Sequence, residues 1–267
     1  MQRIALGVEY DGSRYFGWQR QLNNPSIQQC LEDAISKVAD HSVTVFCAGR
    51  TDTGVHASNQ VVHFETPAIR AAIAWVRGVN SYLPLDIRVC WMHEVSNDFD
   101  ARKSALSRRY CYVMVNRAVS PGIMRQGVTW VLPRLNIEAM QRAAEYLIGK
   151  HDFSSFRGAH CQAKTATRTI QTIKIHSFGD NIILDITANA FLYHMVRNIV
   201  GTLMMVGQGK CEESWVKDVL EAKDRRLAGH TAPASGLYLV DVRYPSHFQL
   251  PAPVRMPWFF VPSLLAT

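Results

Sequence analysis

The order of strand-like and helix-like patterns constrains the fold of this chain more than any other feature. Apolar side chains recur every second residue along one face of a strand and every three or four residues along one face of a helix. The first half of the chain shows these periods in the order β-α-β-β-α-β. The predicted segments are strands at residues 4–10, 43–47, 61–64 and 87–95, and helices at residues 27–38 and from Thr66-Pro67 to about Asn80.

The second half repeats this order of elements without visible sequence identity to the first half. Its predicted segments are strands at residues 110–114, 169–175, 181–187 and 237–242, and helices from Asn136 to about Gly149, at 191–206 and at 213–223. Two split β-α-β patterns indicate an α+β protein with two ferredoxin-like halves and antiparallel sheets. We expect an N-terminal half at residues 1–103 and a C-terminal half at residues 104–267.

The composition excludes several classes of protein. Apolar residues make up 48% and charged residues 19% of 267 residues, as in ordinary globular proteins and unlike disordered chains. The most apolar segment, residues 190–206, is interrupted by His194 and Arg197 and is therefore a poor membrane span. The six cysteines form no CxxC pair. We expect a cytoplasmic protein without a structural metal, and the formal charge of +7 favours a polyanionic partner.

The segment with the most evident chemistry is residues 49–57, GRTDTGVHA, which lie between two apolar strands. Its two glycines permit tight or left-handed turns, so the loop can hold Asp52 in a fixed pose. Arg50 can either pair with that carboxylate or reach a phosphate. The same spacing is typical of an Asx turn, in which Asp52 bonds only its own backbone. Taken alone, the spacing favours this structural role, because short motifs often match by chance.

Five blocks in a fixed order resemble the tRNA pseudouridine synthase A family. They are residues 49–57, 108–112, 151–156, 191–198 and 232–237. Because five ordered blocks are far more specific than one, the resemblance reverses the preference for a structural Asp52. It implies that the chain isomerises uridine to pseudouridine at positions 38, 39 and 40 in the anticodon stem-loop of tRNAs. It also implies a homodimer, and two halves whose sheets pack around a central RNA-binding cleft.

The resemblance assigns roles to individual residues. Asp52 takes the position of the catalytic carboxylate, on the N-terminal half. Tyr110 and Arg197, on the C-terminal half, take the positions of an active-site tyrosine and of the cation that keeps the carboxylate ionised. Arg50 takes the position of the base-flipping arginine. Further contacts to RNA are expected from basic residues, namely Arg70, Arg102, Lys103 and Arg109.

Each of these roles has a plainer structural alternative. Arg197 can be a solvated arginine on an amphipathic helix, although apolar residues surround it in the sequence. Tyr110 can be a strand tyrosine with one wet face, which is what we expect of Tyr112.

The implied reaction adds and removes nothing, so we expect no cofactor and no metal. The residues leave the route open between attack of Asp52 on the ribose or the pyrimidine and removal of a ribose proton. The alternative function is a non-catalytic RNA-binding protein with two RRM-like sheets. The RNP1 pattern of such proteins is not found in the sequence, which weighs against it.

Overall fold

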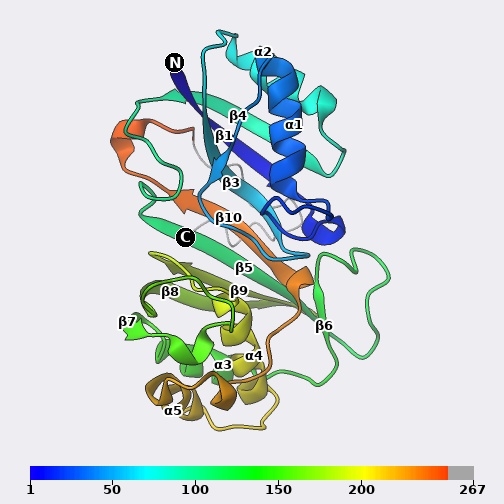
Figure 1. Ribbon diagram of the computed structural model, residues 1–267. Coiled ribbons are helices and arrows are strands. Elements are labelled where there is room, and N and C mark those ends of the chain that lie inside the picture. The colour runs from blue at the N-terminus through cyan, green and yellow to red at the C-terminus, as the bar shows by residue number, and fades with distance from the viewer. Residues whose placement is uncertain (252–267) are drawn as a thin grey trace. The chain divides into compact units, whose positions relative to one another are not determined.

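The chain divides into two compact units, which are described separately (Figure 1). A computed structural model describes residues 1–251. The aromatic run at residues 258–260, to which the sequence assigns no function, lies outside the described residues. Of the described residues, the first unit contains Met1–Leu106 and 238–251, and the second contains Ser107–Leu237. Within the described residues, no helix has both the length and the apolar character of a membrane span.

The first unit has a ferredoxin-like arrangement of strands and helices. Its helices are α1 (Ile27–Ala39) and α2 (Ala72–Tyr82), and its strands are β1 (Gln2–Tyr10), β2 (Phe46–Cys47), β3 (His56–Thr66), β4 (Ile87–Val95) and β10 (Leu237–Arg243). The strand order is β4-β1-β3, with β2 antiparallel to β3 and β10 parallel to β3. The order in which α1 follows β1 and α2 follows β3 is the predicted one, and the α+β class is confirmed.

The core of the first unit lies between one face of its strands and the two helices. Ile4 and Leu6 of β1 are fully buried, as their period-2 spacing predicts. Phe64 of β3 meets Trp75 of α2 edge-on, with ring centroids 5.5 Å apart. Ser26 caps the start of α1, because its hydroxyl accepts a hydrogen bond from the backbone N–H of Gln29.

The start of the second helix was predicted wrongly. Thr66-Pro67 is typical of a helix N-terminus, but α2 begins five residues later, at Ala72. The hydroxyl of Thr66 accepts a hydrogen bond from the N–H of Ala68 at 3.0 Å, so it closes a local turn instead of capping a helix. The strand predicted at residues 43–47 is also reduced to Phe46–Cys47.

The second unit has the element order β-β-α-β-β-β-α-α, in which the short second and third strands were not predicted. Its strands are β5 (Ser107–Asn116), β6 (Thr129–Val131), β7 (Gly149–Asp152), β8 (Thr167–Phe178) and β9 (Asn181–Ala188), and its helices are α3 (Ile137–Glu145), α4 (Met195–Gly207) and α5 (Trp215–Ala222). The strand order is β5-β9-β8-β7, with antiparallel pairs throughout and β6 parallel to β5 at its side. Buried side chains of α4, such as Ile199 and Leu203, form much of its core.

Two boundaries in the second unit differ from the prediction. Helix α4 starts at Met195 and not at Phe191, because His194 adopts a left-handed backbone conformation with φ of 61°. Helix α3 ends at Glu145, and Gly149, with φ of 106°, begins the unpredicted strand β7.

The compact units also differ from the predicted halves at the C-terminal end. The strand β10, predicted as the last element of the second half, pairs in parallel with β3 and groups with the first unit. The division into domains at residues 1–103 and 104–267 stays a prediction.

Candidate active site

Asp52 lies at the first position of a tight turn between β2 and β3. The N–H of Val55 donates a hydrogen bond to the carbonyl oxygen of Asp52 at 3.1 Å. Gly54, the third residue of this turn, has φ of 76°, which is the value that a type II turn requires there and that favours glycine. The Asp52 side chain is half-buried and that of Arg50 is exposed. The turn therefore presents the carboxylate at the surface of the first unit from a defined backbone.

The segment from Gly12 to Trp18 packs against this turn and forms two backbone hydrogen bonds with the loop. The N–H of Trp18 donates to the carbonyl oxygen of Thr51 at 3.0 Å, and the N–H of Gly54 donates to that of Tyr15 at 3.4 Å. Any side chain at Gly12 would place its Cβ 1.9 Å from the carbonyl oxygen of Val55. The two stretches of backbone are therefore in contact, and only glycine fits at this position.

Gly17 makes a second close approach to the same loop. Its φ is 88°, and a Cβ there would lie 2.7 Å from the carbonyl oxygen of Thr51. Both the backbone conformation and the available space thus require glycine.

Three buried polar side chains form hydrogen bonds within and beside the first part of the Asp52 loop. The hydroxyls of Tyr10 and Thr51 are 2.8 Å apart, and the side-chain amide of Gln60 donates to the carbonyl oxygen of Gly49 at 2.6 Å. The same amide nitrogen lies 3.5 Å from the Tyr10 hydroxyl. Tyr10, Thr51 and Gln60 are all buried. These contacts hold the loop on either side of Arg50.

His56, the first residue of β3, is buried immediately after the loop. Its ring stacks on that of Tyr238, with centroids 4.6 Å apart. The Nδ1 atom lies 3.0 Å from a carboxylate oxygen of Asp11 and 3.1 Å from the N–H of Gly12. The nitrogen donates to Asp11 when it carries a proton and accepts from Gly12 when it does not. The hydrogen bond from His56 holds the pKa of Asp11 well below its usual range.

Four basic residues of the first unit are predicted to act on RNA, and two of them lie near the same cysteine. The charges of Arg50 and Arg102 both act on the thiol of Cys47 and oppose the rise in its pKa that burial causes, so both guanidinium groups lie near that residue. Lys103 is exposed, and its Nζ is 3.8 Å from a carboxylate oxygen of Asp100. Arg70 is exposed in the segment before α2 and donates to the carbonyl oxygen of Ile69.

Tyr110 lies on β5 in the second unit and is 8% exposed. Its ring meets that of Phe191 edge-on, at 5.1 Å and 86°. The wet face expected of Tyr112 was predicted wrongly, because that side chain is fully buried and its hydroxyl bonds the hydroxyl of Thr129 and the carbonyl oxygen of Pro233. The extra polar partners explain why a tyrosine is buried so deeply.

Arg197 is half-buried in the first turn of α4. Its Nε donates to the carbonyl oxygen of Ala232 at 2.7 Å, and the N–H of Ala232 donates back to the carbonyl oxygen of Arg197 at 3.1 Å. The Arg197 charge opposes the rise in the pKa of Tyr112 that burial causes, so the guanidinium lies near that phenol. Arg197 is therefore not the purely solvated arginine that was considered as its structural alternative.

Arg109 points away from Tyr110, since neighbouring strand residues alternate between faces. Its Nε lies 2.9 Å from one carboxylate oxygen of Asp185 and 3.1 Å from the other, and Asp185 belongs to the adjacent strand β9. A phosphate would have to compete with this carboxylate for the guanidinium.

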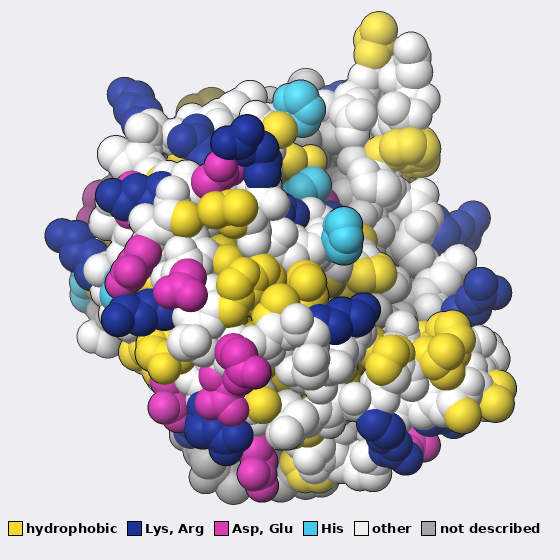
Figure 2. All heavy atoms as spheres, turned by 90° about the horizontal axis from the view of Figure 1, so that it is seen from below, with side chains coloured by type: hydrophobic (Ala, Val, Ile, Leu, Met, Phe, Trp, Pro, Cys, Tyr) yellow, Lys and Arg dark blue, Asp and Glu magenta, His cyan; other side chains and the backbone are white. Residues whose placement is uncertain are grey.

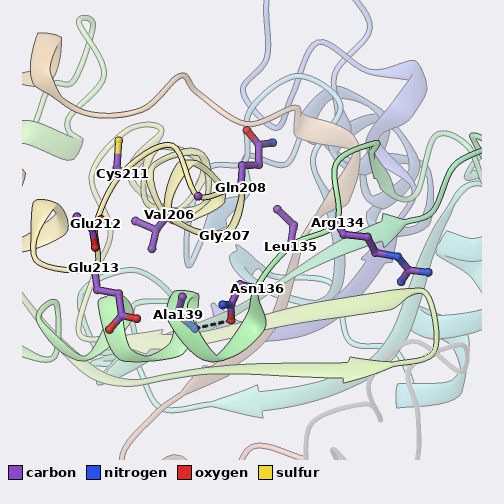
Figure 3. Close-up of a pocket in the computed structure, with 11 residues that line it drawn as sticks. Arg134, Leu135, Asn136, Ala139, Val206, Gly207, Gln208, Cys211, Glu212 and Glu213 are labelled. Atoms are coloured by element: carbon purple, nitrogen blue, oxygen red, sulfur yellow. Dashed lines mark hydrogen bonds between the residues drawn. The ribbon is translucent and has the colours of Figure 1, made fainter.

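One hollow of the second unit is lined by none of the predicted site residues (Figure 3). This hollow, of about 610 Å³, lies between the start of α3 and the end of α4, and Arg134, Gln208 and Glu212 are among its lining residues. The Asn136 side chain in it caps α3 by accepting from the N–H of Ala139 at 3.0 Å.

In the view from below, basic and acidic side chains are interspersed, so this face of the molecule shows no patch of one charge sign (Figure 2).

Comparison with known proteins identifies the family. The sequence profile of the tRNA pseudouridine synthase family matches residues 7–102 and 143–245. The chain belongs to this family. Three relatives named tRNA pseudouridine synthase A agree with that assignment. The protein of Pectobacterium atrosepticum is 53% identical over 96% of this chain and 91% of its own length, that of Cronobacter sakazakii 54% over 96% and 95%, and that of Legionella pneumophila (strain Lens) 55% over 93% and 95%.

The family membership confirms the resemblance found in the sequence and the enzyme class, an isomerase that acts on tRNA. The roles of Asp52, Arg50, Tyr110 and Arg197 stay predictions. Sequence reasoning missed the polar group formed by Tyr10, Thr51 and Gln60. Its only signal was the polar run at residues 58–60 next to an apolar strand. Among residues 1–251, no group of three or more His, Cys, Asp or Glu side chains is arranged to hold a metal ion.

Proposed function

We propose that this synthase converts uridine to pseudouridine at positions 38, 39 and 40 in the anticodon stem-loop of tRNAs, with Asp52 as the catalytic carboxylate. The observation that supports this role best is the turn around Asp52. Its backbone is fixed by hydrogen bonds at Thr51, Gly54 and Val55, whereas Asp52 as a residue is only half-buried. A loop held this firmly can present a reacting group in one pose.

The reaction defines what the carboxylate has to do. The bond from N1 of uracil to C1′ of the ribose breaks, the base rotates, a bond from C5 to C1′ forms, and the proton on C5 leaves to N1 by way of a base or water. An ionised carboxylate can act as nucleophile or remove a proton, and both routes suit Asp52. No atom is gained or lost, so these steps need no co-reactant.

Other residues have roles that rest on the family resemblance. A uridine in a stem reaches an active site only after it leaves the base stack, which costs a few kcal/mol. Arg50, exposed two residues before Asp52, is proposed to occupy the space that the base leaves. Tyr110 is proposed to stack on the uracil, which is worth roughly 1–3 kcal/mol. Arg197 is proposed to supply the cation that keeps the carboxylate ionised.

Contacts to phosphate complete the proposal. The exposed side chains of Arg70, Arg102 and Lys103 are suited to bind phosphate groups, and such contacts make affinity fall steeply with salt. Arg109 is the weakest candidate, because Asp185 already binds its guanidinium. A homodimer, which rests on the resemblance, and a cytoplasmic location, which rests on the composition and the cysteine pattern, also belong to the proposal.

The direct test is to incubate the purified protein, without cofactors, with an unmodified tRNA transcript that carries uridines at positions 38, 39 and 40. We expect pseudouridine at these positions and tritium release from a transcript labelled at C5 of uridine. A transcript with cytidine at the three positions is the control. Binding of tRNA without pseudouridine would contradict the proposal and would favour a non-catalytic RNA-binding protein.

A further inference from the structure

The hydroxyl groups of Tyr10 and of Thr51, the residue before Asp52, form a hydrogen bond with each other. They lie 2.8 Å apart, in the range of a strong O–H···O bond. Tyr10 is 3% and Thr51 7% exposed, so water does not readily replace either partner. Tyr10 ends β1, and Thr51 lies 41 residues later. The bond thus fastens the catalytic loop to the central sheet of the first unit.

Thr51 is held from a second direction through its backbone. Its carbonyl oxygen accepts from the N–H of Trp18 at 3.0 Å. The side chain and the carbonyl together fix the orientation of the peptide plane that leads into Asp52, because that plane can turn only about one free torsion on each side. Loss of the hydroxyl bond would free the side chain and leave the carbonyl contact in place.

Gln60 extends this arrangement to the start of the loop. Its amide nitrogen donates to the carbonyl oxygen of Gly49 at 2.6 Å and lies 3.5 Å from the Tyr10 hydroxyl. Gln60 is fully buried in β3. The sheet therefore contacts the loop at Gly49 and at Thr51, through side chains that point the same way from β1 and β3.

We propose that Tyr10 and Thr51 are positioning residues for the reaction, which set the pose of the Asp52 carboxylate through their shared hydrogen bond. This inference rests on the proposed role of Asp52. Neither side chain touches the substrate in this account. A displacement of about 1 Å at a reacting group can cost about 100-fold in rate, so loss of one bond in the support is expected to lower kcat while tRNA binding is unchanged.

The test compares substitutions that remove one hydroxyl and keep the shape. For Tyr10→Phe and Thr51→Val we expect kcat to fall about 10-fold, with KM and the Kd for tRNA within about twofold of wild type. Thr51→Ser keeps the hydroxyl and is expected to recover most of the rate. Because both substitutions remove the same bond, the double variant is expected to be no slower than either single variant.

Matched controls remove the same hydroxyl groups elsewhere in the first unit. Tyr82→Phe changes a tyrosine that is 60% exposed, and Thr44→Val changes an exposed threonine that lies before β2 and outside the Asp52 loop. Both are expected to react at the wild-type rate. Rates are measured well below the melting temperature of each variant, so a loss of stability alone would leave kcat unchanged.

Three outcomes would overturn the inference: a wild-type kcat for Tyr10→Phe and Thr51→Val, losses that multiply in the double variant, or a Thr51→Ser variant as slow as Thr51→Val. Asp52→Asn is assayed in parallel and separates the two claims. If it keeps its activity, the proposed function of Asp52 fails. If it is inactive while Tyr10→Phe is normal, only the positioning role fails.

Discussion

The loop that carries Asp52 and the helix turn that carries Arg197 are fixed in different ways. The Asp52 loop is fastened partly through side chains, the hydroxyls of Tyr10 and Thr51 and the amide of Gln60. Arg197 is fastened to the backbone of Ala232, which both accepts from its Nε and donates to its carbonyl oxygen. Both regions depend on closely approaching backbones, at Gly12 and Gly17 in the first and at Ala232 in the second, but only the first also depends on hydrogen bonds between side chains.

The largest effect is expected where α4 meets the segment before Ala232. A Cβ at Gly201 would lie 1.7 Å from the carbonyl oxygen of His230, a backbone atom that cannot move by a rotamer change. For Gly201→Ala we expect the free energy of unfolding to fall by about 2 kcal/mol, because overpacking of about 3 kcal/mol exceeds a gain of about 1 kcal/mol in helix propensity. Urea denaturation measures this.

A glycine in open space provides the control for that substitution. Nothing lies within 4 Å of a Cβ at Gly122, so Gly122→Ala is expected to change stability by less than about 0.5 kcal/mol. Equal stability of the Gly201→Ala and Gly122→Ala variants would show that the approach of α4 to His230 is not tight.

A smaller effect is expected when only the side chain of Arg197 changes. Arg197→Lys keeps the charge but loses the Nε–H that donates to Ala232, and lysine cannot reproduce the planar geometry of a guanidinium. We expect turnover to fall about 10-fold and the free energy of unfolding to fall by about 1 kcal/mol. Arg134→Lys, at an exposed arginine of the second unit, is the control for the same exchange. Equal turnover of the two variants would show that the guanidinium of Arg197 has no part in the reaction.

The smallest effect concerns the support beneath the Asp52 loop and depends on pH. The pKa of Asp11 is lowered in the folded protein from its ordinary value of 3.8, chiefly by the hydrogen bond from His56. A carboxylate whose pKa is lowered by folding stabilises the folded state at pH values above its unfolded-state pKa. This stabilisation is lost as the pH falls through the folded-state pKa. The stability difference between wild type and Asp11→Asn is therefore expected to be constant near pH 6 and to shrink below about pH 4.

Urea midpoints of both proteins between pH 2 and pH 7 measure this difference. Asp33→Asn, which changes an exposed carboxylate on α1, is the control. A difference that stays constant down to pH 2 would show that the contact between Asp11 and His56 does not depend on the carboxylate charge.

The sequence predicted most elements because large apolar side chains recur in them at a regular spacing. Ile4, Leu6 and Val8 stand two residues apart in the sequence and are buried in β1, and so the first strand was recognised. The four residues of β7 have no such alternation, since none of them is buried. The start of α4 was missed because residues 191–194 look apolar and helical, while the left-handed backbone of His194 depends on its surroundings.

The candidate site was predictable only in its motif. Asp52 and Arg50 stand in a short loop between glycines, which is visible in the sequence. Tyr10, one of the partners that hold this loop, lies 41 residues before Thr51, and nothing in the local pattern connects the two. Their contact depends on the position of Tyr10 at the end of β1 and on the close approach at Gly12 and Gly17, both of which are properties of the folded chain.

The central claim is that one carboxylate, held by this loop, carries out the isomerisation. Single-turnover release of tritium from C5-labelled tRNA tests it most directly, with Asp52→Asn compared against Asp33→Asn, which makes the same chemical change on the exposed face of α1. We expect Asp52→Asn to lose at least about 10³-fold in rate with tRNA affinity and stability retained, and Asp33→Asn to react normally. Tritium release by Asp52→Asn at the wild-type rate would contradict the account.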